Sequence, residues 1–122
     1  MHNLTDQEIA ELVIEATQQH FGIKNLTVYA SRGGRRRDLV QPRQLACYMI
    51  RELTDFSFPK IASIMGYADH STVWHSYRTA QKNRELMGHI PRIQKTMVVS
   101  IHFLKSHRSW DMRITRLESS DD

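Results

Sequence analysis

Residues 69–82 combine hydrogen-bonding and positively charged side chains at the spacing of an α-helix. One side of the predicted helix is formed by Val73, Trp74, Tyr77 and Ala80. The other side has no aliphatic residue and no acid, and carries His70, Ser71, Thr72, His75, Arg78, Thr79 and Lys82. Hydroxyl, imidazole and guanidinium groups suit base edges and phosphates, so these residues predict a recognition helix for DNA.

A second helix is predicted directly before the first. Ser57 is a suitable N-cap, Pro59 lies in the first turn, and Gly66 ends the helix. Only two residues separate this glycine from Asp69, which can cap the following helix. Two helices joined by a short turn that contains glycine form the helix-turn-helix pattern.

The charge of the chain is concentrated in its middle part. The net charge is −4 over residues 1–23, +7 over residues 24–84 and +1 over residues 85–122, which together make +4. Residues 31–38 contain two glycines and four arginines, and this composition predicts an exposed basic loop. The distribution favours a polyanion as the partner.

Metal binding and catalysis are disfavoured by residue spacing. His70 and His75 are five residues apart, as are His102 and His107, whereas a helical zinc pair needs a spacing of four. An Asp, a His and a Ser that follow one another on a single turn do not face each other, so they do not form a catalytic triad. No two glycines have the five-residue spacing of a phosphate-binding P-loop. We therefore expect no enzyme activity, no metal and no cofactor.

Composition also limits the compartment. No apolar run approaches the length of a membrane span, and the N-terminus lacks the features of a signal peptide. The single cysteine, Cys47, lies in an apolar run and is predicted to pack in the core. We expect a cytoplasmic protein associated with the nucleoid, without membrane contact.

The remaining segments predict further helices. Thr5 and Glu8 form a capping box for a first helix that ends at Gly22, with its acids on the face turned away from any nucleic acid. Pro42 fits the first position of the next helix, and Pro91 can begin the last one. The chain is thus predicted to be all-α, with a DNA-binding domain at 1–105 and a polar tail at 106–122.

Several segments resemble the C-terminal DNA-binding domain of DnaA, the bacterial replication initiator. They are Pro-Arg-Gln-Leu-Ala at 42–46, Arg-Glu-Leu-Thr at 51–54, Ser-Phe-Pro-Lys-Ile at 57–61 and Gly-Tyr-Ala-Asp-His-Ser-Thr-Val-Trp-His at 66–75. The resemblance extends over roughly residues 7–105. It implies a helix-turn-helix fold of the DnaA C-terminal, Trp-repressor-like type, with about five to six helices.

The resemblance also implies roles for individual residues. An arginine of the basic loop, Arg35, would enter the minor groove. The major groove would be read by Asp69, His70, Ser71, Thr72 and Val73. Phosphates would be contacted by Arg36, Arg37, Arg43, Gln44, Arg51, Pro59, Lys60, His75 and Arg78. In chemical terms, Asp69 can accept from a cytosine amino group, and Val73 and the Thr72 methyl can contact a thymine methyl.

Some positions depart from the family pattern. Gly66-Tyr67-Ala68 replaces the usual Gly-Gly-Arg, and Ser71 replaces a threonine. These changes predict a variant DNA site. We expect a transcription regulator, with a replication initiator fragment or a modulator of replication initiation as the alternative.

The start and the end of the chain favour a complete small protein. The tail contains more apolar residues than a solvated end needs, namely Trp110, Met112, Ile114 and Leu117. They are expected either to contact a transcription or replication protein or to pack back on the helices.

Overall fold

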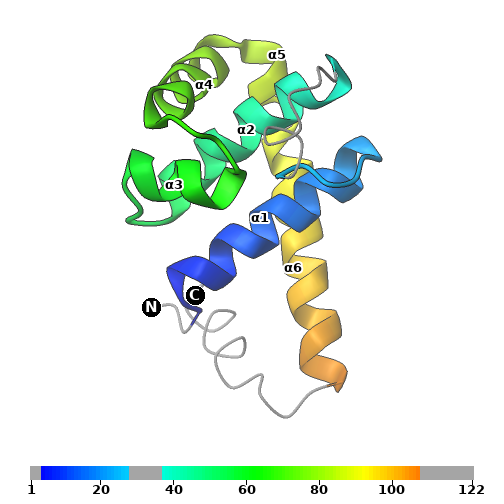
Figure 1. Ribbon diagram of the computed structural model, residues 1–122. Helices are drawn as coiled ribbons and strands as arrows, with labels where there is room; N and C mark the ends of the chain where they lie inside the picture. The colour runs from blue at the N-terminus through cyan, green and yellow to red at the C-terminus, as the bar shows by residue number, and fades with distance from the viewer. Residues whose placement is uncertain (1–3, 28–36, 108–122) are drawn as a thin grey trace.

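The computed structural model describes residues 4–27 and 37–107, with side chains up to residue 102. Within these ranges the fold is all-α, as predicted, and has six helices (Figure 1). They are α1 (Asp6–Phe21), α2 (Arg37–Leu53), α3 (Phe58–Met65), α4 (His70–Lys82), α5 (Arg84–Met87) and α6 (Ile90–His107). The boundary at residue 105 stays a prediction, and the four apolar tail residues lie outside the described part of the chain.

The predicted first helix is confirmed at both ends. The Thr5 hydroxyl accepts from the Glu8 backbone N–H at 3.0 Å, and the Glu8 carboxylate accepts from the Thr5 N–H at 2.9 Å. Gly22 then ends α1 with a φ of 66°, a left-handed conformation that glycine adopts at little cost. Local chemistry therefore sets both ends of α1.

The centre of the fold is α2, which packs against α1, α3, α4 and α5. In Figure 1, α1 crosses α6, and α3 and α4 lie together on the side away from α6. The core contains fully buried side chains from α2, α3 and α4, among them Ile50, Ile61 and Val73. Cys47 is fully buried, as predicted, and burial raises the pKa of its thiol to about 12.

The predicted start of α2 is wrong. Pro42 lies inside this helix, which already includes Arg37. The physical reason is Leu39, which is only 2% exposed and extends the apolar side of α2 by one turn towards the N-terminus. The burial of this leucine outweighs the backbone hydrogen bond that the proline ring cannot donate.

The last helix begins at Ile90, one residue before the predicted Pro91.

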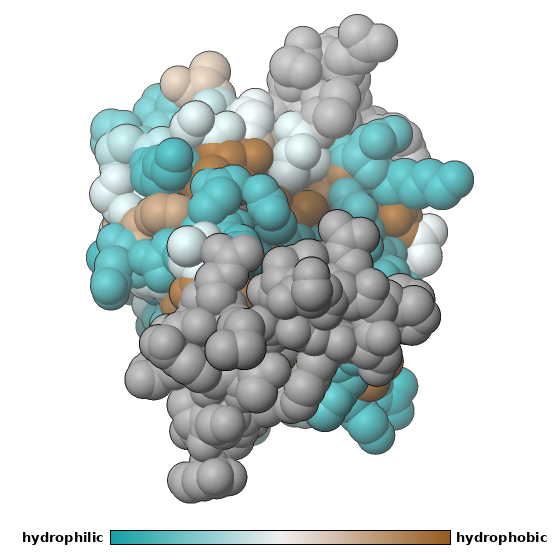
Figure 2. All heavy atoms as spheres, turned by 90° about the horizontal axis from the view of Figure 1, so that it is seen from below, coloured by the Kyte–Doolittle hydropathy of each residue, from teal (hydrophilic) through white to brown (hydrophobic). Residues whose placement is uncertain are grey.

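The surface seen from below carries hydrophobic areas that are small and separated by hydrophilic side chains (Figure 2). Among the described residues, no helix has the length and apolarity that crossing a membrane requires.

Candidate nucleic-acid interface

The helix-turn-helix unit consists of α3, the turn at 66–69 and α4. The Ser57 hydroxyl caps α3 by accepting from the Lys60 N–H at 3.2 Å, in agreement with the prediction. Gly66 ends α3 with a φ of 80°, and a Cβ atom there would overlap the backbone carbonyl of Thr27. Glycine is therefore required twice at this position, for the backbone conformation and for the contact with the preceding loop.

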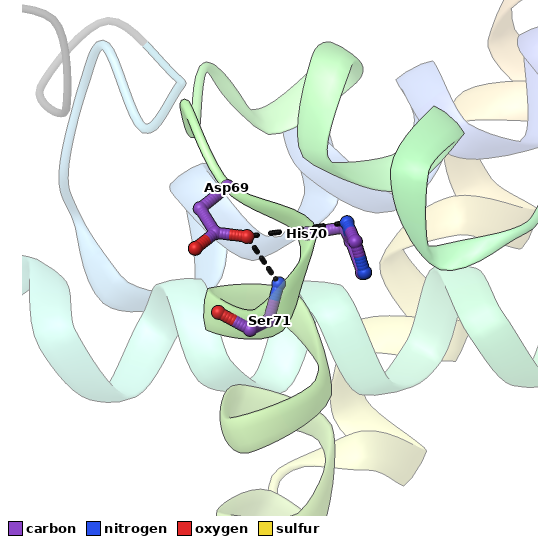
Figure 3. Close-up of polar contacts among 3 residues, drawn as sticks. All are labelled: Asp69, His70 and Ser71. Carbon is purple, nitrogen blue, oxygen red and sulfur yellow. Dashed lines mark hydrogen bonds and ion pairs between the residues drawn. The ribbon is translucent and has the colours of Figure 1, made fainter.

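The start of α4 is set by Asp69, as predicted. Its Oδ1 accepts from the Ser71 N–H at 3.0 Å and lies 3.9 Å from the Nδ1 of His70 (Figure 3). The hydrogen bonds with Ser71 lower the pKa of the Asp69 carboxyl, so this group stays charged at neutral pH. A carboxylate has about four acceptor positions, so the cap leaves Asp69 able to accept from a further group.

The side chains at this helix start are accessible. The side chain of His70 is 63% exposed and that of Asp69 is 66% exposed. The expectation that His70 points away from the core is therefore confirmed.

The polar face of α4 is confirmed as well. All seven of its predicted residues are exposed, namely His70, Ser71, Thr72, His75, Arg78, Thr79 and Lys82. The opposite face packs on α2, where the Tyr77 hydroxyl donates to the Glu52 carboxylate at 2.6 Å. The polar face of α4 is thus held outward by the burial of the opposite face.

Two positions of α4 differ from the prediction. Val73 is fully buried and lies apart from the exposed residues of the polar face, so its predicted base contact has no support in this geometry. Trp74, which the helical period places on the core side, is instead 42% exposed. The buried side of α4 is formed by Val73, Ala80 and the small residue Ser76, which is 7% exposed, and Trp74 lies about 160° around the helix from Ser76.

Arg43 also differs from the prediction, because it is only 2% exposed. Its guanidinium donates to the carbonyls of Leu26 and Met65, the latter at 2.9 Å, and to the Tyr67 hydroxyl at 2.9 Å. It also lies 4.3 Å from the centre of the Tyr67 ring. This geometry gives the predicted phosphate contact of Arg43 no support, and that contact stays a prediction.

These contacts explain Tyr67, one of the departures from the family pattern. The Tyr67 hydroxyl accepts from Arg43, and burial raises the pKa of this tyrosine. Arg43 therefore joins three segments, the loop at Leu26, the end of α3 at Met65 and the turn at Tyr67. The sequence contains one signal for this role, because Arg43 stands among the apolar residues of a predicted helix. This signal alone does not tell whether the guanidinium is buried or exposed.

The other predicted phosphate contacts fall into two groups. The exposed group consists of Arg37, Pro59, Lys60, His75 and Arg78. The half-buried group consists of Gln44 and Arg51. Arg51 donates to the Phe56 carbonyl at 2.9 Å and lies 4.4 Å from the Phe58 ring centre. Arg35 and Arg36 lie outside the described residues.

The part of the chain that the structure describes contains no group of three or more His, Cys, Asp or Glu side chains that could hold a metal ion.

Comparison with known proteins agrees with this geometry. Residues 10–80 match the family described as the bacterial dnaA protein helix-turn-helix. A chromosomal replication initiator protein DnaA of Deinococcus radiodurans is 41% identical over 85 residues, which cover 70% of this chain and 17% of the relative. The initiator of Thermus thermophilus is 39% identical over 80 residues, covering 62% and 18% of the two chains. That of Lachnoclostridium phytofermentans is 35% identical over 91 residues, covering 75% and 19%.

The chain thus spans less than a fifth of the length of these curated relatives. The matched region, residues 10–80, is the helix-turn-helix part of that family. Three observations agree, namely the all-α fold of the described residues, the capped start of α4 and the match over residues 10–80. They show that the chain belongs to the bacterial DnaA helix-turn-helix family.

Proposed function

We propose that this protein binds double-stranded DNA at preferred sequences, with α4 in the major groove and residues 32–37 in the adjacent minor groove. The observation that carries this proposal is the outer face of α4, where seven hydrogen-bonding or basic side chains are all exposed. The helix start presents a charged carboxylate and an imidazole beside each other. A helix face of this kind matches the pattern of donors and acceptors in the major groove.

Base contacts are assigned to the first turn of α4. The Asp69 carboxylate accepts from a cytosine amino group, and His70, Ser71 and Thr72 contact neighbouring base edges. Arg35 enters the minor groove, where narrow A·T-rich sequences concentrate negative potential. Val73 is excluded from this set by its burial.

Phosphate contacts position the helix without reading sequence. We assign them to residues that are exposed or half-buried, together with the loop arginine outside the described ranges: Arg36, Arg37, Gln44, Arg51, Pro59, Lys60, His75 and Arg78. Arg43 is not among them because its guanidinium is buried.

The test is selection of preferred duplexes from a random library, followed by fluorescence anisotropy with the selected and a scrambled duplex at several salt concentrations. Arg78→Ala should weaken binding to both duplexes and reduce the slope of log K against log salt by about 0.9, the value for one phosphate contact. Lys95→Ala is the matched control, because Lys95 is an exposed base on α6 outside the proposed interface. Equal affinity for selected and scrambled duplexes would contradict sequence-specific binding.

For the biological role we propose regulation of transcription. A second candidate, a function in replication initiation at DnaA-box-like sites, is favoured by the three relatives, which are all replication initiators. Genome-wide mapping of bound sites separates the two, because promoter sites support the first role and sites clustered at the replication origin support the second. A map without either enrichment would reject both roles.

A further inference from the structure

Trp74 is a large apolar side chain on the exposed side of the recognition helix. It is 42% exposed, although the residues on the buried face of α4 include Val73 and Ala80, both fully buried. With 3.6 residues per helical turn, Trp74 lies one turn after His70 and one turn before Arg78. The indole therefore lies between two residues that the proposed function places at the DNA.

Two neighbouring side chains hold the indole in place. The Arg78 guanidinium lies 5.3 Å from the centre of the Trp74 ring, within the range of a cation–π contact. The His75 ring meets the indole edge-on, with ring centres 5.2 Å apart and planes at 79°. Both contacts involve only part of the indole, and Trp74 remains 42% exposed.

The major groove offers one apolar group for such a surface, the C5 methyl of thymine. Because Val73 is buried, the aliphatic residue predicted to contact this methyl cannot reach it. We propose that Trp74 makes this contact and so selects thymine at one position of the DNA site. The inference rests on the proposed function, since it requires α4 to lie in the major groove.

The experiment uses the full chain and the duplex that it selects from a random library. Each thymine of that duplex is replaced in turn by deoxyuridine, which lacks only the C5 methyl. For the wild-type protein, one replacement should weaken binding about fourfold, the effect of one methyl group that is no longer removed from water. Trp74→Ala should bind the parent duplex roughly tenfold more weakly and should no longer distinguish thymine from uracil at that position.

Two variants serve as controls. Thr72→Ser removes the Thr72 methyl group, which could contact thymine in place of Trp74, and keeps the hydroxyl. This variant should still distinguish thymine from uracil at the position assigned to Trp74. Val98→Ala shortens an apolar side chain of comparable exposure, 46%, on α6 and should behave as wild type. Melting temperatures of all variants report on folding.

A second measurement does not depend on replacing Trp74. The chain has two tryptophans, so Trp110→Phe leaves Trp74 as the only fluorophore of this kind. Binding of the selected duplex should protect Trp74 from quenching by acrylamide.

Three results would overturn the inference. They are unchanged quenching in the bound state, persistence of the uracil effect in Trp74→Ala, and disappearance of that effect in Thr72→Ser. If no duplex is enriched in the selection, the proposed function fails and this inference fails with it. If a duplex is enriched and Trp74→Ala behaves as wild type, the inference alone fails.

Discussion

Arg43→Met should destabilise the fold without affecting the proposed DNA-binding surface. The substitution keeps an unbranched apolar stem in a position that is 2% exposed and removes the guanidinium. It abolishes three hydrogen bonds, to the carbonyls of Leu26 and Met65 and to the Tyr67 hydroxyl. Because the two carbonyls are then left in the interior without this donor, the destabilisation is larger than that from an exposed pair.

The magnitude follows from these bonds. At about 1 kcal/mol net for each hydrogen bond, the free energy of unfolding should decrease by about 3 kcal/mol, a substantial part of the stability of a typical domain. For a domain of this size the melting temperature should fall by roughly 10–20 °C. Thermal and urea unfolding followed by far-UV circular dichroism measure both quantities.

Arg51→Met is the matched control on the same helix. Arg51 is half-buried and donates to one carbonyl, that of Phe56, so its replacement should cost about 1 kcal/mol. Below its melting temperature, Arg43→Met should show the salt dependence of DNA affinity of the wild type. An unchanged melting temperature with a salt slope reduced by about 0.9 would refute the reasoning and show that Arg43 binds a phosphate.

Three further predictions concern the DNA and the pH. Replacing the arginines of residues 35–37 together by alanine should weaken binding to every duplex. It should also reduce the slope of log K against log salt by about 0.9 for each phosphate that is no longer neutralised. An unchanged slope would show that these residues do not contact DNA. His70→Ala should leave the melting temperature unchanged and weaken binding to the selected duplex roughly tenfold, with little effect on a scrambled one; a large fall in melting temperature with equally weakened binding to both duplexes would mean that His70 holds the turn. Burial, His89 and Arg92 lower the pKa of His20 from its usual 6.5, and its Nε2 lies 2.8 Å from the Nδ1 of His89. The unfolded chain therefore takes up the proton more readily, so stability should be complete above pH 6.5 and decrease as the pH falls below it. His20→Gln should reduce this dependence in melting experiments, and an identical pH profile would contradict the assignment.

Much of the candidate site could be predicted because its signals are local. Ser57, Gly66 and Asp69 each act on backbone groups within a few residues, and all three occur where the sequence places them. The polar face of α4 follows from the helical period in the same way. The prediction for Trp74 follows its apolar character, whereas the period groups Val73 with Ser76 and Ala80 on the buried side and places Trp74 about 100° around the helix from Val73.

Capping and periodicity within single segments were enough to predict α1, α2, α3, α4 and α6, the starts of α1, α3 and α4, and the outward polar face, whereas α5 was not predicted. Which side chains remain accessible was settled by contacts between segments. Arg43 is buried because two carbonyls from segments far apart in the sequence meet beside it, at Leu26 and Met65. Ser76, a polar residue of α4, is buried because α4 packs closely on α2 at this position. Such outcomes depend on how distant elements pack, and this packing is set by the whole core and not by any one segment.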